Sequence, residues 1–432
     1  VKMKVTLLAL FGVGGRGIVS GFSNVVRFRP SVSLKSSVAG VAPVEDTIAT
    51  PLSPLTIWGN ELNNELNEIK ELQKKSQSST YTFPLTIDCT DLSLPTEEAQ
   101  LNYLSTNSLK IKDSMILHGA VIFRNFSLMS TQPGFIKFYE TLGMLPCLDP
   151  LHSVSARPTI EGDTPTNKPS AVYEAVNKES RKNFFIGMHN EFVGTRAPRA
   201  AAFVCFKKAE KGGEFLIADG RKIFADVKED VMERLYKRSI RYSVMELPFF
   251  GWVDNLPEVV RPGLMGALKG LASFAINSKV DFSVELLEQQ GGYDNTRLLQ
   301  ARAPPQPPVV KHPVSGEPTW FCNVHSHSSK LRKEREEIYG KEKFEDGASR
   351  INKSDMFFGD DGDISDEDLK HLDEVTNDNI QYVEMNEGDV VLLDNYKTMH
   401  GRNVFDGTRK HGVCWFGGWE GEEEQKKREW TF

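Results

Sequence analysis

Short apolar runs alternate with polar and glycine-rich connections along most of this chain, a pattern typical of a protein built from many short strands. The runs that predict buried strands lie at residues 120–123, 200–206, 215–219, 389–393 and 412–416. With helical segments around them, these runs predict an α+β fold that is mainly β with flanking helices. We expect its core to be a double-stranded β-helix, or jelly roll.

Helical periodicity occupies the stretches between these strands. Residues 60–75 carry Leu and Ile on one stripe and predict a surface helix, and residues 97–117 and 226–239 are also helical in pattern. Residues 247–299 are glycine-, proline- and aromatic-bearing, and we interpret them as an insertion that flanks the functional site. The polar stretch 151–183 is rich in Pro and Thr and predicts a long loop or lid.

The composition is that of an ordinary globular protein, with 39% hydrophobic and 26% charged residues in a chain of 432. No apolar run approaches the roughly 18–20 residues of a transmembrane helix, so we expect no membrane partner for the mature protein. The five cysteines are widely spaced without a C-x-x-C pair, which predicts reduced core residues rather than a zinc site or a disulfide framework.

The first 44 residues hold six basic residues and no acidic one, and acid returns only at Glu45. A basic start is followed by an apolar run and then by an Arg- and Ser-bearing tract. This order predicts an organellar presequence, with a plastid favoured over a mitochondrion. A disordered leader is the alternative. Without this segment, 46 of the 52 basic residues remain against 59 acidic ones, a net charge near −13. Such an acidic body argues against nucleic acid as a partner.

These features predict a presequence followed by one large catalytic domain. The expected segments are a presequence at 1–44, a linker and surface helix at 45–82, a jelly-roll domain at 83–419 with the insertion at about 247–299, and a charged tail at 420–432.

The candidate chemistry centres on His189 and Glu191. Alternate side chains of an extended strand share a face, so these two residues can point at one spot while Asn190 points away. His400, which follows the apolar run at 389–393, could supply a third ligand. Two histidines and one carboxylate leave three positions of an octahedral metal open, the arrangement of non-haem Fe(II) oxygenases. The sequence therefore predicts an iron centre built from these three residues.

Arg409 is the candidate anchor for an anionic cosubstrate. It lies at the start of the strand predicted after His400, from where its guanidinium could reach back into the pocket. A planar, always-charged fork suits a carboxylate held through two hydrogen bonds, which a lysine does not match.

Together these motifs resemble a known family. His189-x-Glu191, Gly212-Gly213-Glu214, and the segment from Asp394 through His400 to Arg409 look like the Fe(II)/2-oxoglutarate dioxygenases of the taurine dioxygenase superfamily. The glutamate in place of the usual aspartate is similar to the clavaminate-synthase-like members. The resemblance covers roughly residues 83–419 and includes an early strand at 119–124.

The resemblance implies that His189, Glu191 and His400 bind Fe(II), and that Arg409 binds the distal carboxylate of 2-oxoglutarate. It also implies oxidative decarboxylation of 2-oxoglutarate to succinate and CO2, with O2 as oxidant, coupled to hydroxylation or desaturation of a bound substrate. Halogenation is disfavoured because halogenating relatives lack the carboxylate ligand. One position departs from the family: Phe215 stands where members often carry a threonine that helps hold 2-oxoglutarate.

Other residues compete for functional roles. His325-Ser-His327 on a possible strand is a weaker metal pair, which we interpret as cavity-lining or surface histidines. The Asp-rich stretch 360–368 does not match an EF-hand and is better explained by Ser365 as a helix N-cap.

Around the predicted iron centre, His152 and Arg196 are candidates for contact with an anionic substrate. We expect Arg199 to face solvent in a loop, and Arg402 and Asn395 to support the site from outside the ligand set.

The sequence thus favours an iron- and 2-oxoglutarate-dependent dioxygenase that acts on a small polar, possibly amino-acid-like molecule. Two rivals stand beside it. One is a hydroxylase of protein side chains, which would need residues 151–183 to form an open groove. The other is a jelly-roll binding protein without turnover, against which the intact ligand set counts.

Overall fold

The computed structural model describes residues 66–148, 157–160, 172–175, 177, 182–192, 197–278, 282–290, 297–339 and 354–420. All of them belong to the unit formed by residues 48–432. The predicted presequence and most of the predicted tail lie outside the described residues, as do His152 and Arg196. The organellar location and the segment boundaries therefore stay predictions from the sequence.

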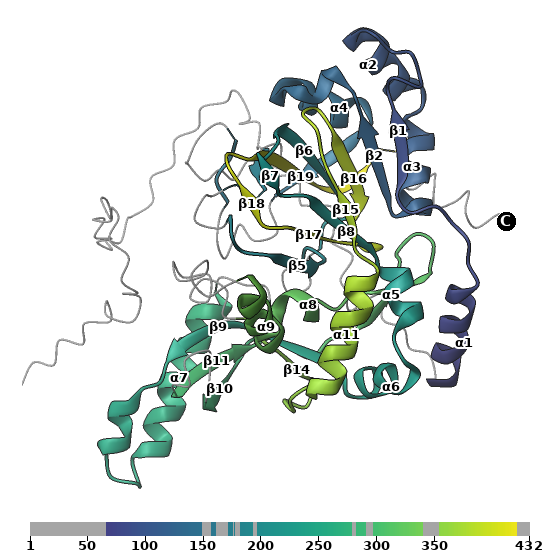
Figure 1. The fold of residues 1–432 in the computed structure, drawn as a ribbon. Helices are drawn as coiled ribbons and strands as arrows, with labels where there is room; N and C mark the ends of the chain where they lie inside the picture. Colours follow the sequence, from purple (N-terminus) through teal and green to yellow (C-terminus); the bar gives the residue numbers. More distant parts are fainter. Residues whose placement is uncertain are drawn as a thin grey trace, which may run out of the picture. The chain divides into compact units, whose positions relative to one another are not determined.

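The largest sheet has seven strands, and residues far apart in the chain meet in it (Figure 1). Its order is β1 (Leu85–Asp88), β2 (Ala120–Arg124), β16 (Val390–Asp394), β6 (Ala200–Lys207), β19 (Lys410–Trp419) and β3 (Met144–Cys147), with β4 (Tyr173–Glu174) paired to β19. The five predicted strands are all present, four of them in this sheet. They form because β-branched and small apolar residues fit a pleated surface that is buried on both faces.

A second sheet of four strands carries the two candidate histidine ligands. Its order is β15 (Gln381–Val383), β8 (Phe215–Asp219), β17 (Thr398–Arg402) and β5 (Ile186–His189). Side chains of β6, β8, β16 and β19 form one buried cluster that includes Phe203, Phe215, Leu393 and Trp415. The two sheets thus share an apolar interior.

The opposite face of the seven-stranded sheet is covered by helices (Figure 1). These are α2 (Glu97–Thr106), α3 (Ser108–His118) and α4 (Gln132–Thr141), whose apolar residues pack with those of β2, β6 and β16. Helices α1 (Leu66–Gln77), α5 (Gly220–Asp226), α6 (Glu229–Arg238) and α11 (Asp366–Asp378) lie with a second core cluster. The mixture of helix and sheet agrees with the predicted α+β class.

The segment interpreted as an insertion contributes to a third sheet. Here β10 (Glu285–Gln290), β11 (Arg297–Arg302), β9 (Ile240–Pro248) and β14 (Met356–Phe358) lie in that order. The 3₁₀ turn η5 (Gly251–Asn255) and helix α7 (Arg261–Asn277) connect β9 to β10. Further along the chain, β12 (Val309–Lys311) pairs antiparallel with β13 (Pro318–Trp320).

Several local predictions can be checked directly. Ser365 is the N-cap of α11 and accepts a hydrogen bond from the Asp368 amide, as predicted. The helix predicted at 226–239 is wrong in its start, because α5 ends at Asp226 and α6 begins at Glu229. The Asp219 side chain caps the N-terminus of α5. This helix start cannot be recognised from the spacing of apolar residues alone.

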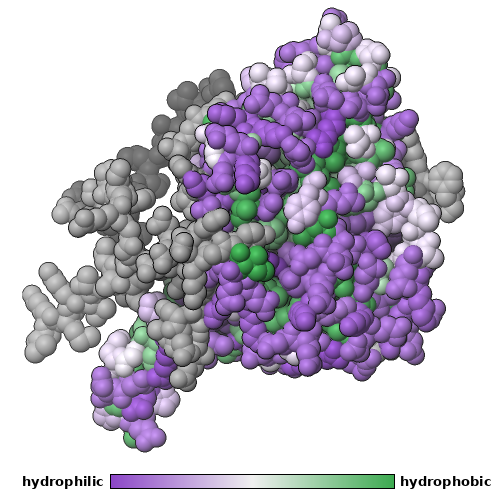
Figure 2. Space-filling view, viewed as in Figure 1, coloured by the Kyte–Doolittle hydropathy of each residue, from purple (hydrophilic) through white to green (hydrophobic). Residues whose placement is uncertain are grey.

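No helix in the described part of the chain is both long and apolar enough to cross a membrane. The visible face of the molecule is mostly hydrophilic, with hydrophobic side chains in small patches (Figure 2).

Candidate metal centre

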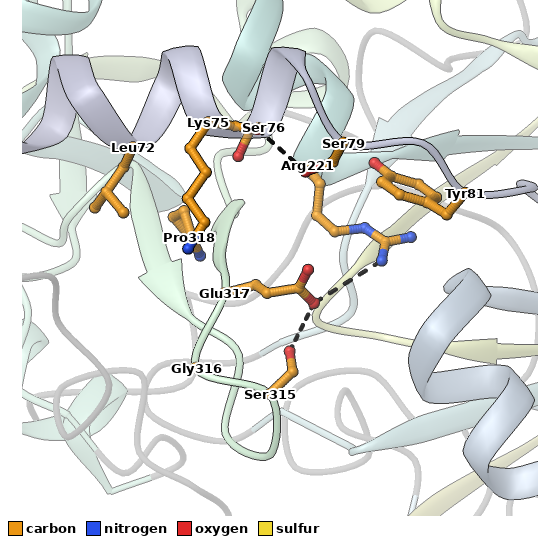
Figure 3. A pocket seen from close by; sticks show the side chains of 10 residues that line it. All are labelled: Leu72, Lys75, Ser76, Ser79, Tyr81, Arg221, Ser315, Gly316, Glu317 and Pro318. Carbon is orange, nitrogen blue, oxygen red and sulfur yellow. Dashed lines mark hydrogen bonds and ion pairs between the residues drawn. The ribbon is translucent and has the colours of Figure 1, made fainter. Parts of the chain in front are cut away.

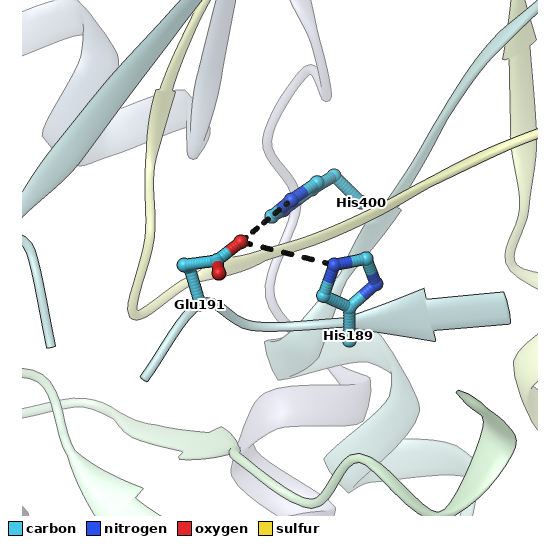
Figure 4. Close-up of side chains that lie close together, drawn as sticks. All are labelled: His189, Glu191 and His400. Carbon is cyan, nitrogen blue, oxygen red and sulfur yellow. Dashed lines mark ion pairs between the residues drawn. The ribbon is translucent and has the colours of Figure 1, made fainter. Parts of the chain in front are cut away.

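The structure brings together the three predicted ligands. His400 on β17 is the register partner of His189, the last residue of the antiparallel strand β5, and Glu191 follows two residues later. Glu191 Oε2 lies 3.9 Å from His189 Nε2 and 3.8 Å from His400 Nε2. The three side chains converge on one point (Figure 4), and their candidate ligand atoms all lie within 4.8 Å of one another. As predicted, His400 follows the apolar strand β16, and it lies within the next strand, β17.

Two glycines permit close approaches to β5: Gly401 lets β17 lie against it, and Gly187 lets it lie against the segment that carries His325. A Cβ at Gly401 would come within 2.5 Å of the Ile186 carbonyl oxygen, and a Cβ at Gly187 within 2.7 Å of the His325 carbonyl oxygen. Real side chains do not tolerate such contacts with backbone atoms. The position of both histidine ligands therefore depends on these glycines.

Amide side chains hold the segment after β5. Asn395 accepts a hydrogen bond from the Glu191 amide and donates one to the Glu191 carbonyl, both at 2.9 Å. Asn323 does the same for Asn190, at 2.8 Å and 2.9 Å. The predicted supporting position of Asn395 agrees with these contacts, whereas Asn323 had no signal in the sequence.

The electrostatics of the triad fit a divalent cation. Burial lowers the pKa of His189 and lowers the pKa of His400 well below the usual 6.5, so both imidazoles are neutral and can act as ligands. His189 Nδ1 lies 2.9 Å from the Gly187 carbonyl, which fixes its proton there and leaves Nε2 with a lone pair. Glu191 Oε2 is buried and has no hydrogen-bond partner among the residues that the structure describes. A buried carboxylate oxygen facing two imidazole nitrogens is a fit for a metal ion such as Fe(II).

The other oxygen of Glu191 has a partner that the sequence did not indicate. Arg157 Nη2 lies 2.6 Å from Glu191 Oε1, and the Arg157 guanidinium lies 5.4 Å from the ring centre of Trp415. Arg157 falls within the stretch predicted as a loop or lid, where no periodicity or motif singles out a residue.

Arg409 is buried, with 4% of its surface exposed. Its Nη1 donates to the Ala175 carbonyl and to Asn177 Oδ1, while its Nε has no hydrogen-bond partner within the described ranges. Burial lowers the pKa of Arg409 to about 9, against the opposing effect of Cys205. No carboxylate in the described part of the chain pairs with this guanidinium. A desolvated cation in this state favours binding of an anion.

His411 is a second buried polar residue beside Arg409. Its backbone amide donates to the same Asn177 Oδ1 at 3.0 Å, and its Nδ1 has no hydrogen-bond partner in the described part of the chain. Burial, with Arg409 and Arg402, lowers the pKa of His411 well below 6.5. His411 lies on β19, which begins at Lys410, and Arg409 directly precedes that strand.

Aromatic rings surround His400. Its ring centre lies 5.0 Å from that of Phe203, 6.1 Å from that of Trp415 and 6.2 Å from that of Phe215, which is stacked at 18°. Phe215, the position that departs from the family, thus forms part of the wall behind the ligand. It supplies no hydrogen bond to a cosubstrate, but it excludes water from the imidazole.

Two predictions about supporting residues are wrong. Arg199 does not face solvent: it is 3% exposed, and its guanidinium lies 5.5 Å from the ring centre of Trp419.

His325 and His327 lie on the short helix α8 (Val324–His327) rather than on a strand. His325 is fully buried and accepts a hydrogen bond from the Met188 amide at 2.8 Å, so it anchors β5. Arg402 donates to the Phe184 carbonyl at 2.9 Å, which agrees with its predicted supporting position.

A separate cavity of about 180 Å³ lies between α1 and the turn after β12 (Figure 3). Arg221 and Glu317 face each other there at 3.9 Å. Arg221 also pairs with Asp219 at 2.8 Å, and Glu317 pairs with Lys397. Arg221 and Glu317, two of the charged residues that line this cavity, therefore already have ion-pair partners.

Comparison with known families identifies the class of protein. A model of the family described as "Taurine catabolism dioxygenase TauD, TfdA family" matches residues 90–415. The chain belongs to this family. It is a non-haem iron dioxygenase, and the cofactors of the family are Fe(II), 2-oxoglutarate and O2. This confirms the resemblance drawn from the sequence motifs. Comparison with curated protein sequences gives no significant match.

The chain is also similar to solved structures of low sequence identity. A structure of AAD-2 with Mn(II) and N-oxalylglycine has a TM-score of 0.40 and 11% identity, over 73% of this chain and 88% of that chain. PvcB, an Fe, alpha-ketoglutarate dependent oxygenase from an isonitrile synthetic pathway, has a TM-score of 0.39 and 12% identity, over 72% and 79%. Asparagine oxygenase with Fe(II), 3-hydroxyasparagine and succinate has a TM-score of 0.38 and 10% identity, over 81% and 90%.

Proposed function

We propose that His189, Glu191 and His400 hold Fe(II) and that the chain couples decarboxylation of 2-oxoglutarate to hydroxylation of a small polar, amino-acid-like substrate, with desaturation as the alternative outcome. The observation that carries this proposal is the buried, unpartnered Glu191 Oε2 between two imidazole Nε2 atoms. When bound, the iron and its cosubstrate supply the oxidising chemistry. The protein supplies three ligands and leaves three positions open.

We infer that the core is a double-stranded β-helix. Strands of the two sheets are interleaved along the chain: β5, β8, β15 and β17 lie in the four-stranded sheet, while β6 follows β5, and β16 and β19 flank β17, in the seven-stranded sheet. The shared apolar interior supports the same arrangement, since a jelly roll buries the inner faces of two sheets against each other.

Arg409 would hold the distal carboxylate of 2-oxoglutarate. Its unpartnered Nε and its low exposure support this role, because a buried guanidinium gains most from a charge-assisted pair. Such a pair outweighs the single neutral hydroxyl bond that is lost with Phe215 in place of threonine. His189, Glu191 and His400 would hold the keto-acid end of the cosubstrate through the metal.

Measurement of succinate tests this function directly. The purified protein with Fe(II), ascorbate and 2-oxoglutarate should release succinate slowly, and faster with the true substrate present. Amino acids, betaines and sulfonates should be compared with peptides that carry the same side chains. Stimulation by peptides alone would favour a protein side-chain hydroxylase. A complete absence of succinate, with or without every candidate, would support a binding protein without turnover.

A further inference from the structure

The two oxygens of Glu191 face different partners. Oε1 accepts a hydrogen bond from Arg157 Nη2 at 2.6 Å, a short contact of the kind formed between two charged groups. Oε2 lies at nearly equal distances from the two histidine Nε2 atoms, at 3.9 Å and 3.8 Å. The carboxylate therefore presents one oxygen to a cation of the protein and the other to the candidate metal position.

We propose that Arg157 is a positioning residue of the metal centre, which reserves Oε1 of Glu191 so that Oε2 alone serves as a ligand. This inference rests on the proposed iron centre and adds to it the residue that orients the carboxylate. Neither the sequence motifs nor the family match assigns a role to Arg157.

The contacts of Asn395 do not orient the carboxylate by themselves. Asn395 binds the main-chain amide and carbonyl of Glu191, which fixes the backbone on both sides. Rotation about the last bond of a glutamate side chain remains broad and roughly two-fold. A contact to one carboxylate oxygen is needed to remove this freedom, and Arg157 provides it.

Arg157 is itself held on two sides. One side is Glu191, and on the other the guanidinium lies 5.4 Å from the ring centre of Trp415, whose side chain is fully buried. A planar guanidinium can stack on an aromatic face while it donates hydrogen bonds in its own plane, which a lysine cannot do. With 18% of its side chain exposed, Arg157 lies at the border of the buried centre.

A ligand that uses one oxygen keeps three positions of an octahedral ion open, enough for a chelating cosubstrate and O2. If both oxygens of Glu191 turned to the metal, one of those positions would be lost. The Arg157 contact therefore has a consequence for chemistry as well as for stability.

The test is Co(II) binding by the full chain, followed by calorimetry and by the absorption bands of the bound ion. We expect Arg157→Met to raise the Co(II) dissociation constant about tenfold, the lower end of the range for lost supporting contacts at metal sites, and to change the absorption bands. Arg157→Lys keeps the charge but not the planar fork. Its Co(II) dissociation constant should therefore lie between those of Arg157→Met and the wild type. Arg157→Gln gives the same readout if the methionine variant does not fold.

Arg124→Met is the matched control. Arg124 pairs with the buried carboxylate of Asp389, with side-chain exposures of 23% and 1%, in a different part of the described structure. It should leave the Co(II) dissociation constant and absorption bands unchanged. Equal Co(II) affinity and equal bands in Arg157→Met and the wild type would overturn the inference. Failure of the wild-type protein to bind Co(II) at all would instead contradict the proposed iron centre, and the inference with it.

Discussion

The side chain of Asn395 binds both backbone polar groups of Glu191. Asn395 Oδ1 accepts a hydrogen bond from the Glu191 amide, and Asn395 Nδ2 donates one to the Glu191 carbonyl, each at 2.9 Å. Asn395 belongs to the short connection between β16 and β17, and β17 carries His400. The connection thus ties the first two candidate ligands to the third. The residue before it, Asp394, is held in turn by His312 at 2.8 Å.

We expect Asn395→Ala to weaken metal binding by about 10- to 100-fold, because the backbone of Glu191 loses both contacts. Unfolding free energy should fall by about 1–3 kcal/mol, since buried amide partners are left unsatisfied. Isothermal titration with Co(II) and urea unfolding measure the two effects. Asn379→Ala is the control: its Nδ2 binds Asp226 and the Val375 carbonyl, and its loss should lower stability without changing metal affinity.

Gly401→Ala should destabilise the protein by about 1–3 kcal/mol and weaken metal binding, because the new methyl group must displace β5 from β17. Gly266→Ala provides the contrast. Gly266 lies on α7 with no heavy atom within 4 Å of the position of a Cβ, so alanine should raise stability by up to about 1 kcal/mol through helix propensity. Thermal denaturation of the two variants should therefore shift in opposite directions. A shift in the same direction would contradict the close packing of β5 and β17.

The His312–Asp394 pair predicts a stability that falls with acid. Burial lowers the pKa of His312 below 6.5, with Lys397 and Arg199 acting in the same direction. His312 Nδ1 accepts from the Ser315 amide at 3.0 Å, which agrees with a neutral ring. Below pH 6.5 the unfolded chain binds a proton that the folded chain does not, so unfolding free energy falls as pH falls, by at most about 1.4 kcal/mol per pH unit for this group.

Asp394 adds a second, lower window. Burial alone would raise the pKa of Asp394, but His312, Arg199 and Lys397 hold it at about 2, below the usual 3.8. Its contribution is complete above pH 3.8 and is lost as pH falls towards 2. Urea unfolding at several pH values between 8 and 5 gives the unfolding free energy as a function of pH. This free energy should change less steeply with pH in His312→Gln than in the wild type. Identical slopes would show that His312 is not neutral in the folded protein.

Arg409→Met should lower the affinity of the Fe(II)-loaded protein for 2-oxoglutarate by about 10- to 100-fold, the effect of losing a charge-assisted contact of about 1.5–3 kcal/mol. Arg409→Lys should recover only part of it, because one ammonium does not replace the guanidinium fork. The Co(II) dissociation constant measured without 2-oxoglutarate should not change in either variant. Loss of metal affinity together with cosubstrate affinity would place Arg409 in a structural role instead.

The strands, and the placement of His189 and Glu191 near one another, could be predicted from the sequence because both follow local rules. The run Val390 to Leu393 is apolar because its strand is buried on both faces, and the two-residue spacing of His189 and Glu191 follows from an extended backbone. His400 could be added because family motifs supply the long-range pairing that periodicity cannot.

The residues that the sequence did not reveal act across long separations. Arg157 meets Glu191, and Asn323 meets Asn190, through tertiary packing that no local pattern encodes. The solvent exposure predicted for Arg199 is wrong. Arginine is usually exposed, whereas here the guanidinium lies over Tyr396 and Trp419. The His325-Ser-His327 spacing suggested a strand, but the segment folds as α8 and buries His325.

We propose above all that His189, Glu191 and His400 form a three-ligand iron centre that accepts 2-oxoglutarate. Anaerobic titration of the protein with Fe(II) and 2-oxoglutarate, followed by visible absorption, tests it most directly. We expect a metal-to-ligand charge-transfer band in the wild-type protein that is lost in Glu191→Ala, together with succinate formation. Absence of the band in the wild type, or its retention with full succinate production in Glu191→Ala, would contradict the proposed centre.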